Sequence, residues 1–118
     1  MKTPNFKVER GDWGMNVAER ALIRKGFQIL RRQWRYQKLA EIDFLVFRSD
    51  TSRFYIVEVK THARGLGEHH SIVSAEQLKR LRLAAFAFKR LWHCGDIVII
   101  LLWVNPLNAN VEFFENPC

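Results

Sequence analysis

An α/β domain with one mixed β-sheet and helices packed against it is the fold that the sequence predicts, and three observations lead to it. Two segments near residues 12–25 and 74–92 carry apolar residues at helical spacing, and three strand-like segments lie between them. A continuous apolar run from Ile97 to Val104 suits a central strand covered on both faces and is far too short to span a bilayer. With 118 residues and no internal repeat, the chain predicts a single domain over residues 1–118.

The first helix is expected to follow a loose leader at residues 1–11 and to run from Asp12 or Asn16 to Lys25. Its apolar residues recur at spacings of three and four and would share one buried face: Met15, Ala18 and Leu22. Gly26 suits the position after a helix end, where the backbone often adopts a left-handed conformation.

Three strands and a second helix are expected next. The strands are rich in β-branched and aromatic residues and cover "FQILRRQWRY" (27–36), "EIDFLVF" (41–47) and "FYIVEVK" (54–60). A helix is expected from Ser74 to about Trp92, with an apolar face at spacings of three and four: Leu78, Leu81, Ala85, Phe88 and Trp92. Strands at 96–104 and 111–115 complete the order αβββαβ(β), with one sheet and helices packed on it.

The chain is basic, with 19 Lys and Arg against 12 Asp and Glu, a net charge of +7 and a pI of about 9.9. Such a balance suggests an anionic partner, for which nucleic acid is the commonest candidate and an anionic membrane surface the second. A basic protein whose charge is incidental is the third interpretation. Two isolated cysteines, Cys94 and Cys118, and an N-terminus without an apolar signal segment predict a cytoplasmic protein with reduced thiols.

The third strand ends in two charges on one face. Side chains alternate across a strand, so Ile56, Glu58 and Lys60 share a face. If the second and third strands pair about the six-residue turn "RSDTSR", Asp43 lies directly opposite Glu58. Like charges in such a position destabilise a sheet unless something positive lies between them, and a one-residue slip would abolish the pairing.

A divalent cation would explain this acidic pair. Mg²⁺ takes oxygen ligands and is typically held by one or two carboxylates together with waters and substrate phosphates. Asp43 and Glu58 would supply the carboxylates, the Val59 carbonyl could add an oxygen, and Lys60 would orient a water or neutralise charge on a phosphate. The alternative is an ordinary exposed Glu–Lys pair at a strand end, because Glu-x-Lys alone is common.

With these residues in place, the sequence resembles a known family. Asp43 followed after a hairpin by Glu58-x-Lys60, between two helices, looks like the PD-(D/E)XK nuclease superfamily, whose restriction-endonuclease-like fold has an αβββαβ core and which includes Holliday-junction resolvases. More closely, several stretches from about Gly14 to Val104 resemble the bacterial YraN-like family: "AERALIRKGFQILRRQWR", "EIDFLVF", "FYIVEVKTHARG" and "QLKRLRLAAFAF".

The resemblance implies a metal-dependent nuclease with Asp43, Glu58 and Lys60 as its catalytic residues, joined by Glu19 from the first helix and Gln77 from the second. Both added residues have a structural alternative, because Asn16-x-x-Glu19 and Ser74-x-x-Gln77 are also capping-box patterns at a helix start. The chain departs from the family pattern at three positions: Ala40 replaces a Gly, His62 an Arg, and a residue near Gln33 an Asn.

Basic residues around this site are candidates for nucleic-acid contacts. Arg31, Arg32 and Arg35 alternate with Trp34 and Tyr36, a pattern in which Arg would contact phosphate and an aromatic ring would stack on a base. His62 and Arg64 after the third strand, and Lys79 and Arg80 on the second helix, are further candidates. In each case a solvated basic surface is the alternative.

The leading hypothesis is therefore a Mg²⁺- or Mn²⁺-dependent endonuclease that acts on DNA, including branched or repair intermediates. The alternative is a non-catalytic nucleic-acid-binding module of the same fold in a DNA-processing complex, and a protein-interaction subunit is the third. No membrane partner is expected. Resolvase-like relatives act as dimers on two-fold symmetric junctions, so a homodimer is a further expectation.

Overall fold

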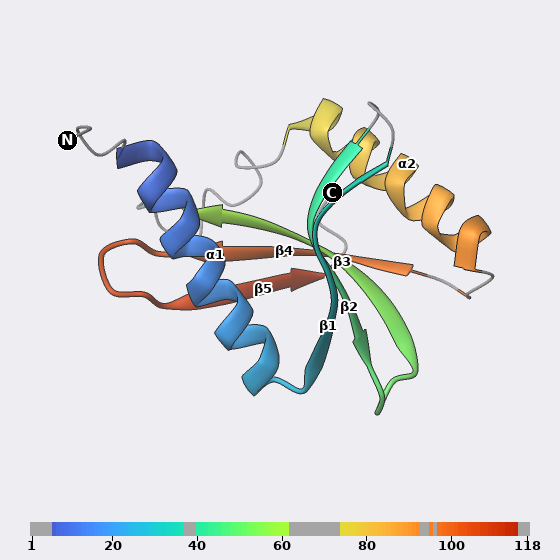
Figure 1. Ribbon diagram of the computed structural model, residues 1–118, viewed down its shortest axis with the longest axis horizontal. Helices are drawn as coiled ribbons and strands as arrows, with labels where there is room; N and C mark the ends of the chain where they lie inside the picture. Colours follow the sequence, from blue (N-terminus) through green and yellow to red (C-terminus); the bar gives the residue numbers. More distant parts are fainter. Residues whose placement is uncertain (1–5, 37–39, 62–73, 93–94, 96, 116–118) are drawn as a thin grey trace.

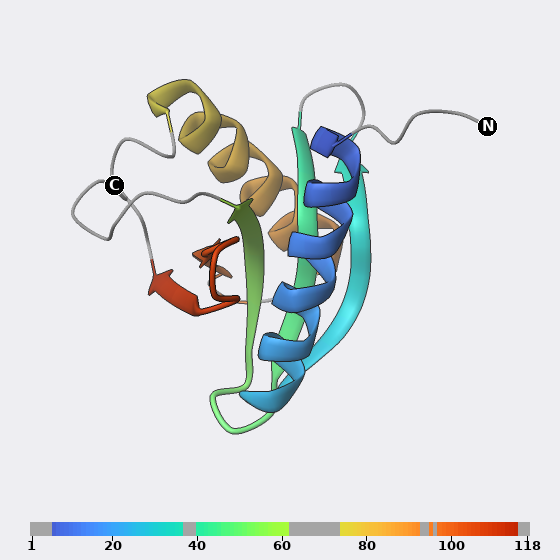
Figure 2. The same cartoon turned by 90° about the vertical axis from the view of Figure 1, so that its left-hand side faces the viewer.

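Two helices pack on opposite faces of one five-stranded sheet in the computed structural model of the chain (Figures 1 and 2). The structure describes residues 6–36, 40–61, 74–92, 95 and 97–115. Its elements follow one another as α1 (Phe6–Arg24), β1 (Phe27–Tyr36), β2 (Ala40–Arg48), β3 (Arg53–Thr61), α2 (Ala75–Trp92), β4 (Ile97–Val104) and β5 (Val111–Glu115). The predicted order of elements is confirmed, and each strand lies within one residue of its expected bounds.

The strands are ordered β1-β2-β3-β4-β5 across the sheet. Three neighbouring pairs are antiparallel, whereas β3 and β4 are parallel, so the sheet is mixed as predicted. The parallel pair requires a crossover connection, and α2 lies within it. Residues 98–104 of β4 are all buried, which confirms that this apolar run is a strand covered on both faces.

Each helix covers its own apolar layer. On one face, Ala18 and Leu22 of α1 pack with Phe44, Val57 and Leu102 of the sheet. On the other face, Leu81, Ala84 and Phe88 of α2 pack against the sheet. The sheet residues in this layer include Leu45, Ile56 and Ile99. The alternation along β3 thus sends Ile56 toward α2 and Val57 toward α1, as the strand pattern requires.

The first helix begins earlier than the sequence predicts. Because α1 starts at Phe6, the expectation of a loose leader is wrong for residues 6–11, and residues 1–5 lie outside the described part of the chain. Glycine lowers helix propensity, and Gly11 and Gly14 both fall in this region. Gly14 has a packing reason for its place: a Cβ there would lie 2.0 Å from Thr61 Oγ1. Close contact between α1 and β3 therefore explains a glycine that local propensity does not favour.

The second helix begins as predicted. Ser74 Oγ accepts a hydrogen bond from the Gln77 backbone N–H at 3.0 Å, which is the geometry of an N-cap. The outer side of α2 carries a large apolar side chain, because Phe86 is 61% exposed. Neither helix of the described residues is long and apolar enough to cross a membrane.

Candidate active site

The hairpin between β2 and β3 forms in the predicted register. Leu45 pairs with Ile56 and Phe47 with Phe54, and the ladder extends to Phe44 and Val57. One further step brings Asp43 beside Glu58. Asp43 Oδ2 accepts a hydrogen bond from the backbone N–H of Val59 at 2.7 Å, which ties this carboxylate to β3 next to Glu58. The acidic pair expected from the sequence is thus assembled.

Two further side chains converge on Glu58, which is only 8% exposed. Lys60 Nζ lies 3.6 Å from Glu58 Oε1, as expected for residues two apart on one strand face. Gln77 Nε2 donates a hydrogen bond to the same oxygen at 2.7 Å, from the first turn of α2. Only half of the capping-box alternative therefore holds, because Ser74 caps the helix while the Gln77 amide reaches the acidic pair instead.

The electrostatics of the pair follow from burial and like charge. Burial, reinforced by the neighbouring charge of Asp43, raises the pKa of Glu58 to about 8. Burial also raises the pKa of Asp43 above its ordinary value, against the opposing effects of the Val59 N–H and the charge of Lys60. In the free protein near neutral pH, Glu58 is therefore largely protonated. A proton on Glu58 thus relieves the repulsion between the two carboxylates, as the cation expected from the sequence would also do.

The pair also suits a divalent cation by its donor chemistry. Burial and mutual repulsion raise the pKa of Glu58, and a hard cation between the two carboxylates would offset both effects. Mg²⁺ needs no more protein ligands than one or two carboxylates, because waters and phosphate oxygens complete its shell. No larger group, with three or more His, Cys, Asp or Glu, gathers within the described ranges. Asp43 and Glu58 are thus the residues that would hold the metal.

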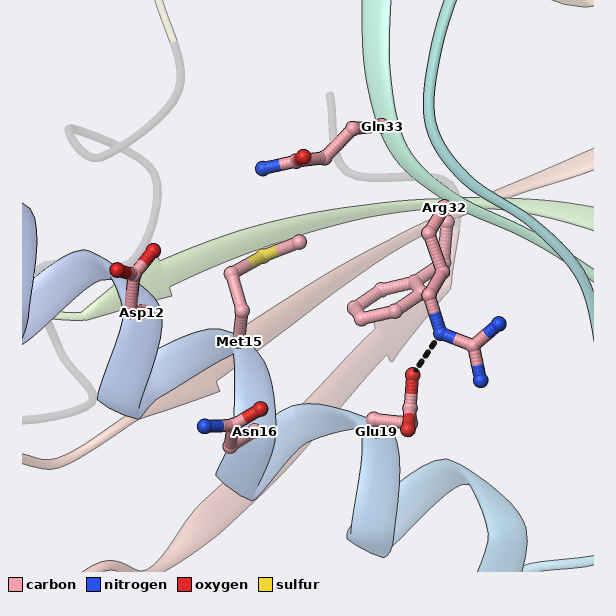
Figure 3. A pocket seen from close by; sticks show the side chains of 7 residues that line it. Asp12, Met15, Asn16, Glu19, Arg32 and Gln33 are labelled. Carbon is pink, nitrogen blue, oxygen red and sulfur yellow. Dashed lines mark hydrogen bonds and ion pairs between the residues drawn. The ribbon is translucent and has the colours of Figure 1, made fainter.

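Glu19 lies in a different environment. It projects from α1, on the opposite face of the sheet from α2, and its Oε1 pairs with Arg32 Nε of β1 (Figure 3). This bond raises the pKa of Arg32 above its ordinary value. Because α1 begins at Phe6, Glu19 is inside the helix and its capping-box alternative is wrong. The structure accordingly brings Gln77, Lys60 and Asp43 to Glu58, while it engages Glu19 elsewhere.

A protein-family model matches residues 15–101 of the chain. The chain belongs to the uncharacterised protein family UPF0102. A UPF0102 protein of Roseiflexus castenholzii is 42% identical over 81 residues, which cover 69% of this chain and 62% of that protein. Another, from Clavibacter michiganensis subsp. michiganensis, is 31% identical over 117 residues and covers 92% of this chain and 94% of that protein. The resemblance inferred from the motifs is therefore confirmed.

Two solved structures resemble this UPF0102 chain in fold. A repair endonuclease from Pyrococcus abyssi aligns with a TM-score of 0.51 and 14% identity, over 90% of this chain and 40% of that chain. An XisH family protein from Nostoc punctiforme aligns with a TM-score of 0.50 and 13% identity, over 86% of this chain and 98% of that chain. The restriction-endonuclease-like α/β fold is thereby confirmed, and identities this low concern the fold alone.

The arginines of β1 in this UPF0102 member do not share one surface. Arg31 lies over the ring of Trp92, 5.7 Å from its centroid, on the α2 side. Arg32 pairs with Glu19 on the α1 side, and Arg35 Nη2 bonds Glu41 Oε2 at 3.0 Å. Their predicted role in nucleic-acid contacts stays a prediction, and Arg31 and Arg32 would serve it on different faces of the sheet.

The other predicted contact residues have mixed outcomes. Trp34 packs edge-on against Phe88, with centroids 6.1 Å apart, and is partly buried against the α2-side core. On α2, Lys79 is exposed, whereas Arg80 Nη2 is bonded to Glu76 Oε1 at 2.8 Å. His62 and Arg64 lie outside the described residues.

Sequence reasoning missed a second group of polar residues, which lines a cavity between α1 and β1. Asp12 and Asn16 lie there beside Glu19, and Gln33 faces them from β1 (Figure 3). A signal was present in the sequence: residues 12, 16 and 19 recur at helical spacing and so lie on one side of α1, next to its apolar face.

Proposed function

We propose that the chain is a Mg²⁺-dependent endonuclease that hydrolyses phosphodiester bonds in DNA, branched or damaged DNA included. The observation that carries the proposal is the gathering of Asp43, Glu58, Lys60 and Gln77 at one end of β2 and β3. An acidic pair with a strongly raised pKa, next to a lysine, is a combination common at catalytic sites. The net charge of +7 supports a polyanionic substrate.

Each residue has a distinct role in this proposal. Asp43 and Glu58 would hold the metal, and bound Mg²⁺ would stabilise charge on the phosphate and lower the pKa of a water molecule. Glu58 must first release its proton, because a metal binds the carboxylate form. Lys60 would stabilise the negative charge that develops on the scissile phosphate. Gln77 is a positioning residue, since its amide fixes the orientation of the Glu58 carboxyl group.

The family and the fold add support of a coarser kind. The UPF0102 family model covers residues 15–101, and this range includes Asp43, Glu58, Lys60 and Gln77. The Pyrococcus abyssi structure with a similar fold is a repair endonuclease, which makes nucleic acid a reasonable substrate class to test first. Fold alone does not fix function, so the chemistry of the site carries the proposal.

The decisive experiment is a cleavage assay on supercoiled plasmid and on a four-way junction, with Mg²⁺, Mn²⁺ or EDTA. We expect cleavage with either metal, none with EDTA, and none by Asp43→Ala or Lys60→Ala. Asp50→Ala is the matched control, because Asp50 is an exposed acid in the turn of the same hairpin and pairs with Arg48.

The alternative outcomes separate the remaining functions. No cleavage together with salt-sensitive DNA binding that Asp43→Ala retains would favour the non-catalytic binding module. No DNA binding at low salt would favour the protein-interaction subunit. A homodimer and a cytoplasmic location, both expected from the sequence, stay predictions.

A further inference from the structure

A cavity of about 410 Å³ lies between α1 and the sheet (Figure 3). The Glu58 carboxyl group is on the other face of the sheet, where it accepts a hydrogen bond from Gln77 of α2. Its volume lies within the range of small-molecule sites, which is roughly 300–1,000 Å³. Two apolar side chains contribute to its wall, Met15 of α1 and the buried Phe44 of β2. The remaining wall is polar: Asp12, Asn16, Glu19, Arg32 and Gln33.

The polar groups in this wall fall into two sets. Glu19 and Arg32 satisfy each other through their ion pair. Asp12, Asn16 and Gln33 have side chains without a hydrogen-bond or ion-pair partner among the residues that the structure describes. Donors and acceptors of two amides and one carboxylate are therefore available to a ligand.

The backbone also holds Gln33 in an unusual conformation. Its φ of 49° lies in the left-handed region, which is costly for a residue with a Cβ. Such positions cluster at ligand-binding sites, where the surrounding structure maintains them. In Figure 3 the Gln33 amide extends from β1 toward the side of the cavity that carries Asp12 and Met15.

The chemistry of the cavity favours a nucleobase over a phosphate group. Because Arg32 is neutralised by Glu19, Asp12 leaves the wall with a net negative charge, which repels phosphate. Asn and Gln amides can hydrogen-bond the donor and acceptor pattern of a base edge, and a carboxylate accepts from an exocyclic amino group. Met15 and Phe44 provide apolar contacts of the kind that hold an extruded base.

The cavity lies at the same end of the sheet as the acidic pair. Phe44, in its wall, follows Asp43 directly in β2, and Gln33 lies on β1 between the residues paired with Phe44 and Ile42. On the other side, Gly14 of α1 contacts Thr61, the residue after Lys60. The acidic pair and the cavity are thus close to each other along the sheet, although they lie on its two faces.

We propose that this cavity binds an unpaired, extrahelical nucleobase of the DNA, with a preference for bases that carry an exocyclic amino group. The inference rests on the proposed function for its substrate class and deepens it. It assigns recognition of an unpaired nucleotide to Asp12, Asn16 and Gln33, residues outside the metal-binding pair.

The test compares binding of three DNA duplexes that differ at a single bulged position, which holds adenine, thymine or an abasic sugar. Binding is measured by fluorescence anisotropy at low salt with EDTA, so that no cleavage occurs. We expect the adenine bulge to bind about ten-fold more tightly than the abasic bulge, and thymine to lie between them. The abasic duplex controls for recognition of bent DNA, because it keeps the backbone shape and lacks the base.

Variants then locate the effect. Asn16→Ala and Gln33→Gly should each bring the ratio of adenine to abasic affinity close to one, and Asp12→Asn should narrow the difference between adenine and thymine. Glycine suits position 33 because it accepts a positive φ. Gln28→Ala, an exposed Gln on the same strand, is the matched control and should leave the ratio unchanged. Thermal melts of each variant show whether the fold is retained.

The inference is overturned if the wild-type protein binds adenine and abasic bulges equally. It is also overturned if Asn16→Ala and Gln33→Gly leave the adenine-to-abasic ratio unchanged and Asp12→Asn leaves the difference between adenine and thymine unchanged. Its failure is distinguishable from that of the proposed function. Metal-dependent cleavage of DNA without base preference would retain the nuclease and reject the base site. Base preference without cleavage under Mg²⁺ or Mn²⁺ would do the opposite.

Discussion

The two faces of the sheet hold carboxylates in opposite circumstances. On the α2 face, Glu58 is buried beside another acid and its pKa rises to about 8. On the α1 face, Glu19 lies beside a guanidinium whose side chain is 59% exposed. The first arrangement is costly for the fold unless a proton or a metal is taken up, whereas the second needs neither.

This contrast distinguishes the proposed active site from an ordinary surface ion pair. An exposed ion pair contributes little to stability because water screens it and two side chains lose freedom. A buried like-charged pair reduces stability wherever both groups are charged, and such arrangements recur where chemistry is performed. We therefore expect substitutions on the two faces to differ in activity, in pH dependence and in stability.

The largest difference is expected in cleavage. Glu58→Gln should reduce the cleavage rate by at least about 100-fold, since it removes the charge of a residue to which the proposed function assigns metal binding. Glu19→Gln, a matched change on the other face, should reduce it by less than about ten-fold, because Glu19 already binds Arg32. Single-turnover rates with Mg²⁺ measure both. Equal losses would mean that the two faces act as one catalytic site.

The next difference concerns the pH dependence of folding. The pKa of Glu58 is higher in the folded state than its ordinary value of 4.5, so folded protein binds more protons than unfolded protein between these values. The contribution of Glu58 to the free energy of unfolding is fully present below about pH 4.5 and is lost as pH rises through about 8. The loss is on the order of a few kcal/mol.

Glu58→Gln should abolish this loss, because an amide does not titrate and can still accept the Gln77 hydrogen bond. Urea unfolding at pH 5, 7 and 9, without metal, measures the effect. The variant should match the wild type at pH 5 and exceed it at pH 9. If the free energy of unfolding changes with pH in the same way for both proteins, the raised pKa of Glu58 is contradicted. Glu19→Gln is the control and should leave the pH dependence of the free energy of unfolding unchanged.

A smaller effect is expected where α1 meets the end of β3. Gly14→Ala should destabilise the protein by about 1–3 kcal/mol, because the new methyl group would overlap Thr61. Adding Thr61→Ala should recover most of this loss, since the remaining contact, to the Thr61 Cβ, is 3.3 Å. Gly95→Ala is the control, as nothing lies within 4 Å of a Cβ there. Additive losses in the double variant would reject the steric explanation.

The smallest effect is expected for the exposed pair. Arg32→Ala should leave the urea midpoint almost unchanged, because Arg32 is solvent-exposed and its ion pair is screened. A double-mutant cycle with Glu19→Ala measures the coupling directly. A coupling as large as the one between Gly14 and Thr61 would show that the α1 face depends on this pair for stability.

The parts of the site that the sequence predicted depend on local pattern. A six-residue turn and strict alternation determine the register of β2 and β3, so Asp43 and Glu58 meet as expected. The Gln77 contact could not be derived in this way, since it joins residues 19 positions apart through the packing of α2. Only the family resemblance suggested it, and the same resemblance did not show where Glu19 would bind.

The errors lie where the chain departs from regular geometry. A bulge between Ile29 and Arg31 interrupts the alternation of β1, and the left-handed backbone at Gln33 interrupts it again. Arg32 and Trp34, two residues apart, consequently face opposite layers. The start of α1 was missed for a related reason. Gly14 disfavours a helix locally, but it is required by close contact with Thr61, which lies 47 positions later in the chain.

The contact between Gly14 and Thr61 fixes how closely α1 can approach the end of β3. There is no room for a methyl group between them, so α1 cannot move closer to the end of β3 unless the Thr61 side chain moves. A displacement of α1 toward β3 would therefore shift the Thr61 side chain, which directly follows Lys60 in the strand. Thr61→Ala would remove the atom that lies nearest to Gly14, so the position of α1 would depend less on the end of β3.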